Sequence, residues 1–501
     1  TIYDYTSKGN IVAVISNGSA VLGLGNIGAA ASKPVMEGKS VLFKKFADVD
    51  GIDLEVDTED TEKFIDAISL LEPSFGGINL EDIKAPDAFE IERRLVDELD
   101  IPVMHDDQHG TAIISGAALI NALEIADKKI DKVKMVICGA GAAAISCGKI
   151  YKALGIKAEN IIMFDSKGPL NEKRDNLTSE KKDFISNRND VETLSDAVKN
   201  SDIFIGLSKA NMLTAEMLKT MASNPIVFAM ANPDPEISYQ LAISTRNDII
   251  MATGRSDHPN QVNNVLGFPF IFRGALDVKA SKINEEMKMA AVHALAKLAK
   301  EPVPEYVNIA YGEKKLAFGR DYIIPKPFDQ RLITTVPLAV ARAAISSGVA
   351  RENIEDWVKY ENELASRLGN NNKITRLLIS KAKNNPKRIV YPEADKLDVI
   401  KAAQIVHEEG IGIPILLGNR ERIEKMRSEI EYENEVEIID LSESKHDKIK
   451  DKYAKTFVEL RRHKGLSFKK ARQLMNYRNY FGCMMVKQGS ADAFISGYSR
   501  S

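Results

Sequence analysis

The stretch that decides the fold runs from Lys132 to Ala144 and reads KVKMVICGAGAAA. Its first half is a short apolar run, which predicts a buried strand. Gly139 and Gly141 follow at once, and Ala142 opens a predicted helix. Glycines between a strand and a helix let the backbone approach a pyrophosphate at the helix N-terminus. The pattern predicts an α/β protein with a Rossmann-type dinucleotide-binding domain. The alternative is a glycine-rich turn without a cofactor.

An acidic residue after the next apolar run adds to this pattern. Residues 160–164 predict a second strand, and Asp165 follows it, 21 residues after Ala144. A carboxylate here accepts the ribose 2′-OH of NAD⁺ and repels the 2′-phosphate of NADP⁺. Ser166 and Lys167 come next, with further cations that could instead pair with that phosphate. These cations are Lys173, Arg174, Lys181 and Lys182, and each could equally be a solvated surface charge.

Three more apolar runs, at 202–206, 225–230 and 248–252, continue the α/β alternation. Each ends in a polar loop, so these loops are expected at strand carboxyl ends, where open α/β sheets bind ligands. Asn232 and Asn264 lie in the second and third loops. They could present amides to a carboxylate or a nicotinamide, although loop asparagines are usually turn residues.

Two acidic pairs upstream predict a metal site. The pair Glu81-Asp82 follows a predicted strand at 75–80, and the pair Asp106-Asp107 follows one at 101–104, within HDDQHGT. Carboxylates gathered at strand ends repel one another unless a proton or a cation lies among them. Mg²⁺ and Mn²⁺ prefer such oxygen ligands. The alternative for Asp106-Asp107 is a solvated loop that caps a helix over Thr111–Ile125.

The start of the chain contains a second glycine pattern. Residues 11–15 predict a strand, and Gly23, Gly25 and Gly28 then spell GxGxxG. Because no acidic residue follows a second strand at the expected distance, the pattern is interpreted as a flexible active-site loop. Residues 34–39 are expected to lead into a strand at 41–43. By composition alone, Lys39 would be a solvated lysine.

A passage rich in proline and a run of asparagines divide the rest of the chain. Helices are expected at 283–300, 330–346 and 351–368, and Gly369-Asn370-Asn371-Asn372 is the expected domain boundary. From residue 387 onward a strand, a helix to Glu409 and a strand at 414–417 begin another α/β unit. The expected divisions are a domain at 1–110, a domain at 111–345, a helical linker at 346–379 and a domain at 380–501.

Composition argues against several functions. The 501 residues are 44% apolar and 28% charged, with a net charge of −3. Basic residues do not gather with aromatic ones, so nucleic-acid binding is not expected. The most apolar run, 135–148, is too short for a membrane span, and the polar first residues predict no signal peptide. Three distant cysteines suit reduced thiols, which favours a cytoplasmic location.

Together these stretches resemble the bacterial NADP-dependent malic enzymes of the hybrid type, in which a malic enzyme is fused to a phosphotransacetylase-like domain. The matching stretches are Val21–Gly28, Pro34–Lys39, Phe75–Asp82, Val103–Thr111, Gly254–Asn264 and Phe272–Asp277. Residues 380–501 resemble the first part of a phosphotransacetylase. The resemblance implies a metal- and substrate-binding α/β domain before the Rossmann-type domain. It implies that malate is oxidised with NADP⁺ and decarboxylated to pyruvate. NAD⁺ is the alternative cofactor.

The resemblance also implies roles for individual residues. The metal, Mg²⁺ or Mn²⁺, would be bound by Glu81, Asp82 and Asp107. Lys39 would be the general base, with Asp106 as the carboxylate beside it. The cofactor contacts would be Gly139, Gly141, Ala142, Ala144, Asp165, Ser166, Lys167, Asn232, Gly23, Gly25, Asn26 and Gly28. Asn232 and Asn264 would contact the substrate. A homo-oligomer is expected, with acetyl-CoA as an effector at the C-terminal domain.

Two departures from the family pattern matter. The family's general acid is a tyrosine in an Ala-Tyr-Ser-Pro-Gly-type motif, and neither Tyr3 nor Tyr5 lies in such a motif, so this proton donor is not expected among these residues. The phosphotransacetylase-like part stops before the half that carries much of that enzyme's substrate site, so transacetylase activity is not expected. The alternatives are a metal-dependent oxaloacetate decarboxylase and a non-catalytic regulatory scaffold.

Overall fold

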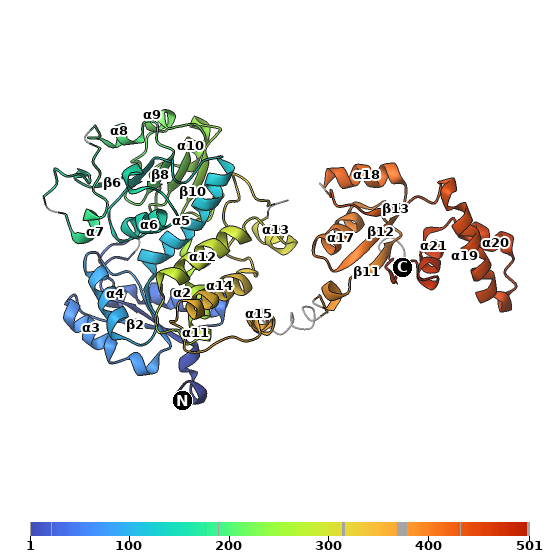
Figure 1. Ribbon diagram of the computed structural model, residues 1–501, viewed down its shortest axis with the longest axis horizontal. Helices are drawn as coiled ribbons and strands as arrows, with labels where there is room; N and C mark the ends of the chain where they lie inside the picture. The colour runs from blue at the N-terminus through green and yellow to red at the C-terminus, as the bar shows by residue number, and fades with distance from the viewer. Residues whose placement is uncertain are drawn as a thin grey trace. The chain divides into compact units, whose positions relative to one another are not determined.

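The computed structural model describes residues 2–21, 23–175, 177–188, 190–312, 316–367, 378–379, 381–430 and 432–497. The chain divides into two compact units, Thr1–Leu368 and Gly369–Ser501 (Figure 1). Both units are built from parallel sheets and helices, which confirms the predicted α/β class. The expected boundary at Gly369–Asn372 lies outside the described residues. The finer domain limits remain predictions.

The first unit begins with a four-stranded parallel sheet in the order β2-β1-β3-β4. Its strands are β1 (Ile11–Ser16), β2 (Asp50–Glu55), β3 (Gly77–Leu80) and β4 (Val103–His105). Leu80 pairs with His105 across β3 and β4. Glu81 and Asp106 are therefore the next residues at the carboxyl edge of two neighbouring strands, which confirms the predicted position of the acidic pairs.

Helix α2 (Ala29–Ala47) follows the upstream glycine pattern and corrects one prediction. Residues 41–43 are helical, so the strand expected there is wrong. A short apolar run fits a strand or a helix equally well. Met36 and Phe43 are both buried seven residues apart, which is a helical spacing, and Phe43 packs edge-on against Phe268 with ring centroids 4.7 Å apart. Lys39 therefore lies on the face of a helix that packs on the core.

The second sheet of this unit has six strands in the order β10-β9-β8-β5-β6-β7. They are β5 (Met135–Cys138), β6 (Ile161–Asp165), β7 (Gly168–Pro169), β8 (Ile203–Gly206), β9 (Ile226–Ala229) and β10 (Ile250–Thr253). All pairs are parallel except that of β6 with the short β7. The chain order reverses at β5, and sheets of this kind bind ligands at strand carboxyl ends beside such a switch point. The Rossmann-type prediction is confirmed.

Helix α5 (Asp106–Ile125) connects the two sheets (Figure 1). It is buried along most of its length, as expected for a helix enclosed by other elements. It packs on α6 (Ala142–Ala153) and on α12 (Glu285–Leu298). The remaining helices of the unit are α1 (Ile2–Tyr5), α3 (Thr61–Ser69), α4 (Asp87–Glu98), α7 (Ser179–Lys182), α8 (Leu194–Val198), α9 (Ala215–Thr220), α10 (Tyr239–Thr245), α11 (Phe268–Asp277), α13 (Glu305–Tyr311), α14 (Leu332–Ser346) and α15 (Trp357–Ser366).

Helix α15 begins later than the sequence predicts. Asp356 is its N-cap, and its side chain accepts the backbone N–H of Lys359 at 2.9 Å. Residues 351–356 are therefore not part of the helix expected from 351. The helices expected at 283–300 and 330–346 are confirmed as α12 and α14, with small shifts at their ends.

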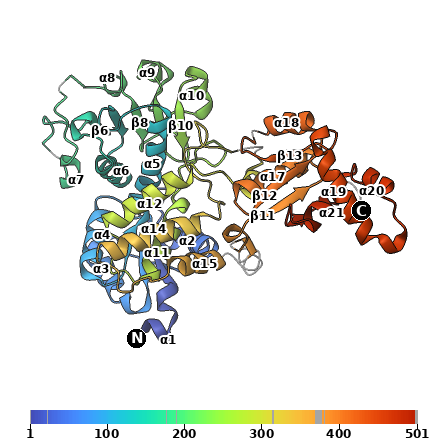
Figure 2. The same ribbon diagram turned by 45° about the vertical axis from the view of Figure 1, so that its right-hand side comes forward.

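The second unit contains a four-stranded parallel sheet in the order β13-β12-β11-β14. Figure 2 labels β11, β12 and β13 of this sheet. Its strands are β11 (Lys387–Tyr391), β12 (Gly412–Leu417), β13 (Glu437–Ile439) and β14 (Ala493–Phe494), and its helices include α17 (Leu397–Glu408), α18 (Arg420–Glu429), α19 (Asp447–Leu460), α20 (Phe468–Leu474) and α21 (Arg478–Lys487). The strand, helix and strand predicted from residue 387 onward are confirmed. Among the described helices of both units, none is long and apolar enough to cross a membrane.

Candidate active site

Three carboxylates meet where β3 ends and α5 begins. Glu81 and Asp82 follow β3, Asp107 lies in the first turn of α5, and ligand oxygens of all three lie within 4.8 Å of one another. Glu81 and Asp82 are buried, and Asp107 is half-buried. The backbone N–H of Asp82 donates to Asp107 Oδ2 at 2.7 Å. The structure thus brings together the three residues expected to bind a metal.

The charges of this cluster suit a divalent cation. Burial raises the pKa of the Glu81 carboxyl well above its usual range. Lys39 opposes this shift in the pKa, while Asp107, Asp106 and Asp82 add to it. Asp106 Oδ1 is buried and has no hydrogen-bond partner within the described part of the chain. Carboxylates enclosed together disfavour the ionised form of Glu81, and a hard cation with oxygen ligands would remove this repulsion. Mg²⁺ and Mn²⁺ both fit this donor set.

Lys39 reaches the cluster from α2. Its Nζ lies 2.9 Å from Glu81 Oε1 and also contacts the Asp106 carboxylate. The ring centroid of Phe268 is 3.9 Å from the same nitrogen. Burial alone would lower the pKa of this ammonium, but Asp106 and Glu81 outweigh burial and raise it. Lys39 is therefore an enclosed cation, unlike the solvated lysine that composition alone suggests.

Asp106 is held by a residue far along the chain. Asn264 Nδ2 donates to Asp106 Oδ2 at 3.2 Å, and Thr111 Oγ1 donates to Asn264 Oδ1 at 3.1 Å. At Gly110 a Cβ would come within 2.2 Å of Asp106 Oδ1 and 2.8 Å of the Asn264 carboxamide carbon. Glycine is therefore required at position 110, because a side chain would separate Asp106 from Asn264.

Helix α5 begins five residues before the position expected from the sequence. Asp106 and Asp107 form its first turn, and His105 is the N-cap, without a side-chain capping bond. The alternative of a loop whose aspartates cap a helix at Thr111 is therefore wrong. Acidic residues in the first turn of a helix interact favourably with the helix dipole, so both aspartates suit this position.

The glycine turn between β5 and α6 has the predicted geometry. Gly139 has a φ of +133°, and a Cβ there would lie 2.3 Å from the carbonyl oxygen of Leu207. Gly141 is the N-cap of α6, and a Cβ there would meet open space. Ala142 is the first residue of α6, and Ala144 is buried. The free N–H groups of this helix end therefore face a space that a pyrophosphate could occupy.

Asp165 ends β6, and its charge is balanced by neighbouring cations. Arg174 donates from Nη1 and Nη2 to the two carboxylate oxygens, at 3.2 Å and 3.0 Å, and Lys181 Nζ lies 3.0 Å from Oδ2. The backbone N–H of Lys167 donates to Oδ1. Burial alone would raise the pKa of Asp165, but these donors lower it to about 2. Two of the five cations expected near a 2′-phosphate, Arg174 and Lys181, thus pair with the carboxylate. Ser166 and Lys167 are exposed.

The upstream glycine loop faces the second sheet. Gly23, Gly25 and Gly28 have φ values between +76° and +79°, which favour glycine. A Cβ at Gly23 would lie 3.9 Å from Pro233 Cδ, so the loop approaches the segment that follows β9. Asn26 Nδ2 donates to a carboxylate of a neighbouring loop, Glu59 Oε1, at 3.1 Å. The loop therefore lies where both halves of the unit meet.

Asn232 lies exposed in the segment after β9, immediately before Pro233. A Cβ at Gly254, which follows β10, would lie 3.3 Å from Asn232 Nδ2. Asn232 thus lies between the glycine loop and the loop after β10, at the carboxyl edge of the second sheet. Of the two expected asparagines, Asn264 is the one that hydrogen-bonds with Asp106.

Several supporting residues are not predicted from the sequence. Asn79 Nδ2 donates to Glu81 Oε2 at 3.0 Å, and Glu92 accepts the backbone N–H of His105 at 2.7 Å. Phe268 covers Lys39. Asn79 does carry a signal, because a polar residue two positions before Glu81 in a buried strand points to the same face. Glu92 and Phe268 have partners distant in the sequence and carry no such signal.

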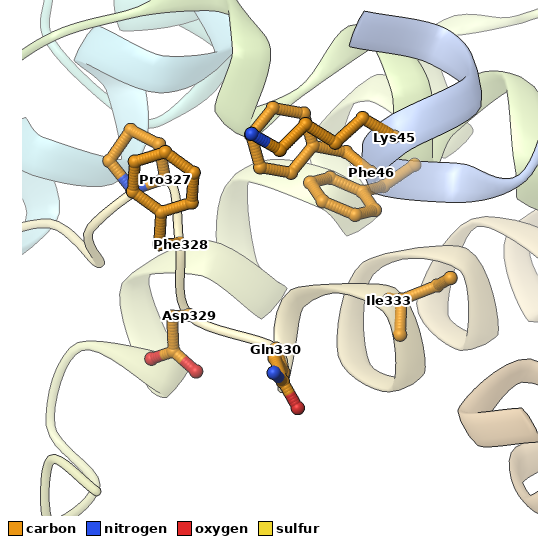
Figure 3. A pocket seen from close by; sticks show the side chains of 8 residues that line it. Lys45, Phe46, Pro327, Phe328, Asp329, Gln330 and Ile333 are labelled. Atoms are coloured by element: carbon orange, nitrogen blue, oxygen red, sulfur yellow. The ribbon is translucent and has the colours of Figure 1, made fainter. Parts of the chain in front are cut away.

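A separate cavity of about 220 Å³ lies near the end of α2 (Figure 3). It is lined by Lys45, Phe46, Phe270, Pro327, Phe328, Asp329, Gln330 and Ile333. Lys45 is six residues beyond Lys39, which is roughly 9 Å along a helix axis. The cavity contains none of the predicted site residues, and it is not part of the acidic site.

Known protein families match three consecutive parts of the chain. Residues 1–96 match the malic enzyme N-terminal domain, residues 108–310 the malic enzyme NAD binding domain, and residues 373–501 the phosphate acetyl/butaryl transferase family. An NADP-dependent malic enzyme from Halomonas elongata is 59% identical over 349 residues, covering 70% of this chain and 82% of that protein. The chain belongs to the malic enzyme family. The resemblance expected from the motifs is therefore confirmed.

Other malic enzymes extend this comparison to the whole chain. An NADP-dependent malic enzyme of Rhizobium meliloti (strain 1021) is 49% identical and covers 100% of this chain, and an NAD-dependent malic enzyme of the same organism is 46% identical. The chain spans 66% of the length of each. The crystal structure of malic enzyme from Pyrococcus horikoshii matches with a TM-score of 0.66 and 38% identity, over 76% of this chain and 85% of that one.

Proposed function

We propose that this protein is an oxidative, decarboxylating malic enzyme that converts (S)-malate to pyruvate and CO₂, with NADP⁺ as hydride acceptor and Mg²⁺ or Mn²⁺ as metal. The observation that carries the proposal is the enclosed ammonium of Lys39, which lies between Asp106 and Glu81 beside the three-carboxylate cluster. Oxidation of a 2-hydroxy acid needs a group that accepts the hydroxyl proton and a centre that stabilises the oxygen left behind. Lys39 on α2 offers the first, and the carboxylates that follow β3 and β4 offer a site for the second.

The residues of the site divide this chemistry among them. The carboxylate cluster would hold the divalent cation, which when bound polarises the hydroxyl and carboxylate oxygens of the substrate. With a divalent cation held by the carboxylate cluster, Glu81 would raise the pKa of Lys39 less, and burial would then favour the neutral amine. That amine would accept the hydroxyl proton at Nζ, and Asp106 would stabilise the ammonium that forms. Asn264 would keep the Asp106 carboxylate in place, because its amide donates to Oδ2. Phe268 would exclude water from one side of Lys39.

The choice of NADP⁺ over NAD⁺ rests on the cations that pair with Asp165. The dinucleotide would lie along the turn Gly139–Ala144 and would supply the hydride acceptor. Its adenosine ribose would then approach Asp165, where Arg174 and Lys181 already lie on the carboxylate. A 2′-phosphate would meet these cations, and charge-assisted bonds to phosphate are among the strongest hydrogen bonds in proteins. NAD⁺ is the alternative, because a relative of similar identity carries that name.

The proposal is tested by following reduced dinucleotide and pyruvate with the purified protein. Both products are expected only when malate, NADP⁺ and Mn²⁺ are present together, and a chelator is expected to stop their formation. An oxaloacetate decarboxylase would release pyruvate from oxaloacetate but would reduce no dinucleotide with malate. A regulatory scaffold would do neither, so the same two measurements separate all three functions.

Further expectations accompany this proposal. A homo-oligomer, an acetyl-CoA effector site in the second unit and a cytoplasmic location all remain predictions. Light scattering of the purified protein measures the first. Initial rates with and without acetyl-CoA measure the second, and they are interpretable only once malate oxidation has been demonstrated.

A further inference from the structure

A fully buried carboxylate, Glu236, lies behind the edge where the dinucleotide would bind. Its Oε1 accepts the backbone N–H of Ser208 at 2.9 Å, and its Oε2 accepts the backbone N–H of Ala231 at 3.2 Å. Burial raises the pKa of this carboxyl, and the backbone donors oppose the rise. Burying a carboxylate costs stability unless its hydrogen bonds are made. Glu236 is buried at the carboxyl edge of the second sheet with a backbone donor for each oxygen, and this arrangement indicates a specific role.

The two donors belong to the loops that would surround the cofactor. Ser208 follows β8, and Ala231 follows β9 and directly precedes Asn232. The residue before Ser208 is Leu207, whose carbonyl oxygen lies where a Cβ of Gly139 would be. One carboxylate therefore connects the loop beside the pyrophosphate turn with the segment that presents Asn232. The β8 strand that leads to this site lies inside the second sheet (Figure 1).

The end of β8 is shaped to accept this side chain. At Gly206 a Cβ would lie 2.3 Å from the carboxyl carbon of Glu236 and 2.4 Å from its Oε2. The carboxylate of Glu236 thus occupies the space that the side chain of any residue other than glycine would fill at position 206. Gly206 and Glu236 are spatially coupled, although they are 30 positions apart in the sequence.

We propose that Glu236 is a positioning residue for dinucleotide binding. It holds the loops after β8 and β9 at a fixed separation, so that the Asn232 amide and the turn at Gly139 face the same cofactor. The inference rests on the proposed function for the identity of that cofactor. It assigns Glu236 no contact with substrate or metal, and it predicts that the acidic cluster works without it.

The test uses Glu236→Gln, which keeps the shape of the side chain. One acceptor oxygen remains, and the other becomes an amide that faces an N–H donor. A hydrogen bond to a charged group is stronger than one to a neutral group. Losing it should loosen the two loops and raise the dissociation constant of NADPH about tenfold or more. The dissociation constant is measured by NADPH fluorescence, which needs no turnover. Glu216→Gln, at an exposed position on α9, is the matched control and should bind as the wild type does.

A second readout separates positioning from general damage to the fold. Metal-dependent decarboxylation of added oxaloacetate should change less than about twofold in Glu236→Gln, while kcat/KM for NADP⁺ falls about tenfold or more. Equal losses in both reactions, or NADPH binding equal to that of the wild type, would overturn the proposal. A wild-type protein that binds NADPH but oxidises no malate would refute the proposed function and leave the binding test of Glu236 intact.

The glycine provides an independent test of the same contact. Gly206→Ala should weaken NADPH binding because the new methyl group displaces the carboxylate. In the double variant Gly206→Ala with Glu236→Ala, the methyl group enters space that the carboxylate has left, so the double variant should bind no more weakly than the worse single variant. Losses that multiply would show that the two residues act separately and would overturn the coupling.

Discussion

Lys39 on α2 and Asp106 at the start of α5 form an ion pair in the interior, with 9% and 0% of their side chains exposed. Glu81 Oε1 lies 2.9 Å from the same ammonium. Such a pair is weak evidence for stability, because the cost of removing both charges from water can exceed the gain from their attraction. An enclosed ammonium among carboxylates, at the ligand-binding edge of a sheet, is better explained by proton transfer.

Replacing Lys39 with Ala is expected to lower kcat by about 10²-fold or more, since a positioned acid or base contributes roughly 10²–10⁴-fold. The KM for malate should change far less, because proton transfer is felt mainly in the transition state. Steady-state kinetics measure both, with Lys45→Ala, exposed on the same helix, as control.

The Lys39→Ala variant also leaves Asp106 buried without its partner, which costs roughly 3–5 kcal/mol. Thermal unfolding is therefore measured for the same variant, and adding Asp106→Asn should restore part of the lost stability without restoring kcat. A folded Lys39→Ala protein with wild-type kcat would show that Lys39 takes no part in proton transfer.

Replacing Asp107 with Ala should remove one of three oxygen ligands of the metal. Mn²⁺ binding, followed by electron paramagnetic resonance, should weaken at least ~100-fold, because even an outer-shell partner is worth 10–100-fold in affinity. The melting temperature of the wild type should rise with added Mn²⁺, and that of the variant should not. Asp66→Ala, at an exposed position on α3, should behave as the wild type in both measurements.

The metal-free Asp107→Ala protein should have a stability close to that of the metal-free wild type, because the hydrogen bond lost from the Asp82 N–H is offset by weaker repulsion among the carboxylates. The variant removes one of the carboxylates that raise the pKa of Glu81 by repulsion. Wild-type Mn²⁺ affinity in this variant would contradict the metal site.

Patterns carried by neighbouring residues were predictable from the sequence. The Gly139 turn needs only a strand before it and a helix after it, and the acidic pairs follow strands whose apolar runs are plain. Residues 41–43 show the limit of this reasoning, because three apolar residues fit a strand as well as the helix that Met36 and Phe43 reveal.

Contacts between distant residues were not predictable. Asn264 reaches Asp106 across 158 positions, and the carboxylate of Glu236 reaches a backbone N–H 28 positions away. Asp165 shows a subtler limit. Cations near it were expected from the sequence, but their pairing with the carboxylate itself depends on how the chain folds between β6 and α7.

The pKa of Glu92 gives a prediction for stability at acid pH. Burial alone would raise this pKa, but His109, Lys288 and His105 lower it to about 2. In the unfolded chain the pKa returns to ~4.3. The unfolded state therefore binds the proton more readily. The stability that the carboxylate contributes is fully present above about pH 4.3 and is lost as the pH falls towards 2.

Replacing Glu92 with Gln should remove this dependence. The wild type should unfold at a higher urea concentration than the variant near ~pH 6, and the difference should shrink as the pH is lowered towards ~3. Glu90→Gln, exposed on the same helix, should show no such trend. A difference between wild type and Glu92→Gln that stays constant with pH would mean that the carboxylate is not held ionised by its neighbours.

Cofactor preference should depend on Arg174, because its guanidinium lies on Asp165 at 3.0 Å and would pair with a 2′-phosphate. Replacing Arg174 with Ala should lower kcat/KM for NADP⁺ about tenfold or more, since a hydrogen bond to a charged group is worth that factor, and should change kcat/KM for NAD⁺ little. Lys219→Ala, at an exposed position on α9, is the control. Asp165→Ala should have the opposite selectivity, because it removes the acceptor for a ribose 2′-OH while leaving the cations in place. Steady-state kinetics with both cofactors distinguish the two outcomes. A wild-type preference for NAD⁺ that Asp165→Ala abolishes and Arg174→Ala leaves unchanged would show that the carboxylate, and not the cations around it, selects the dinucleotide.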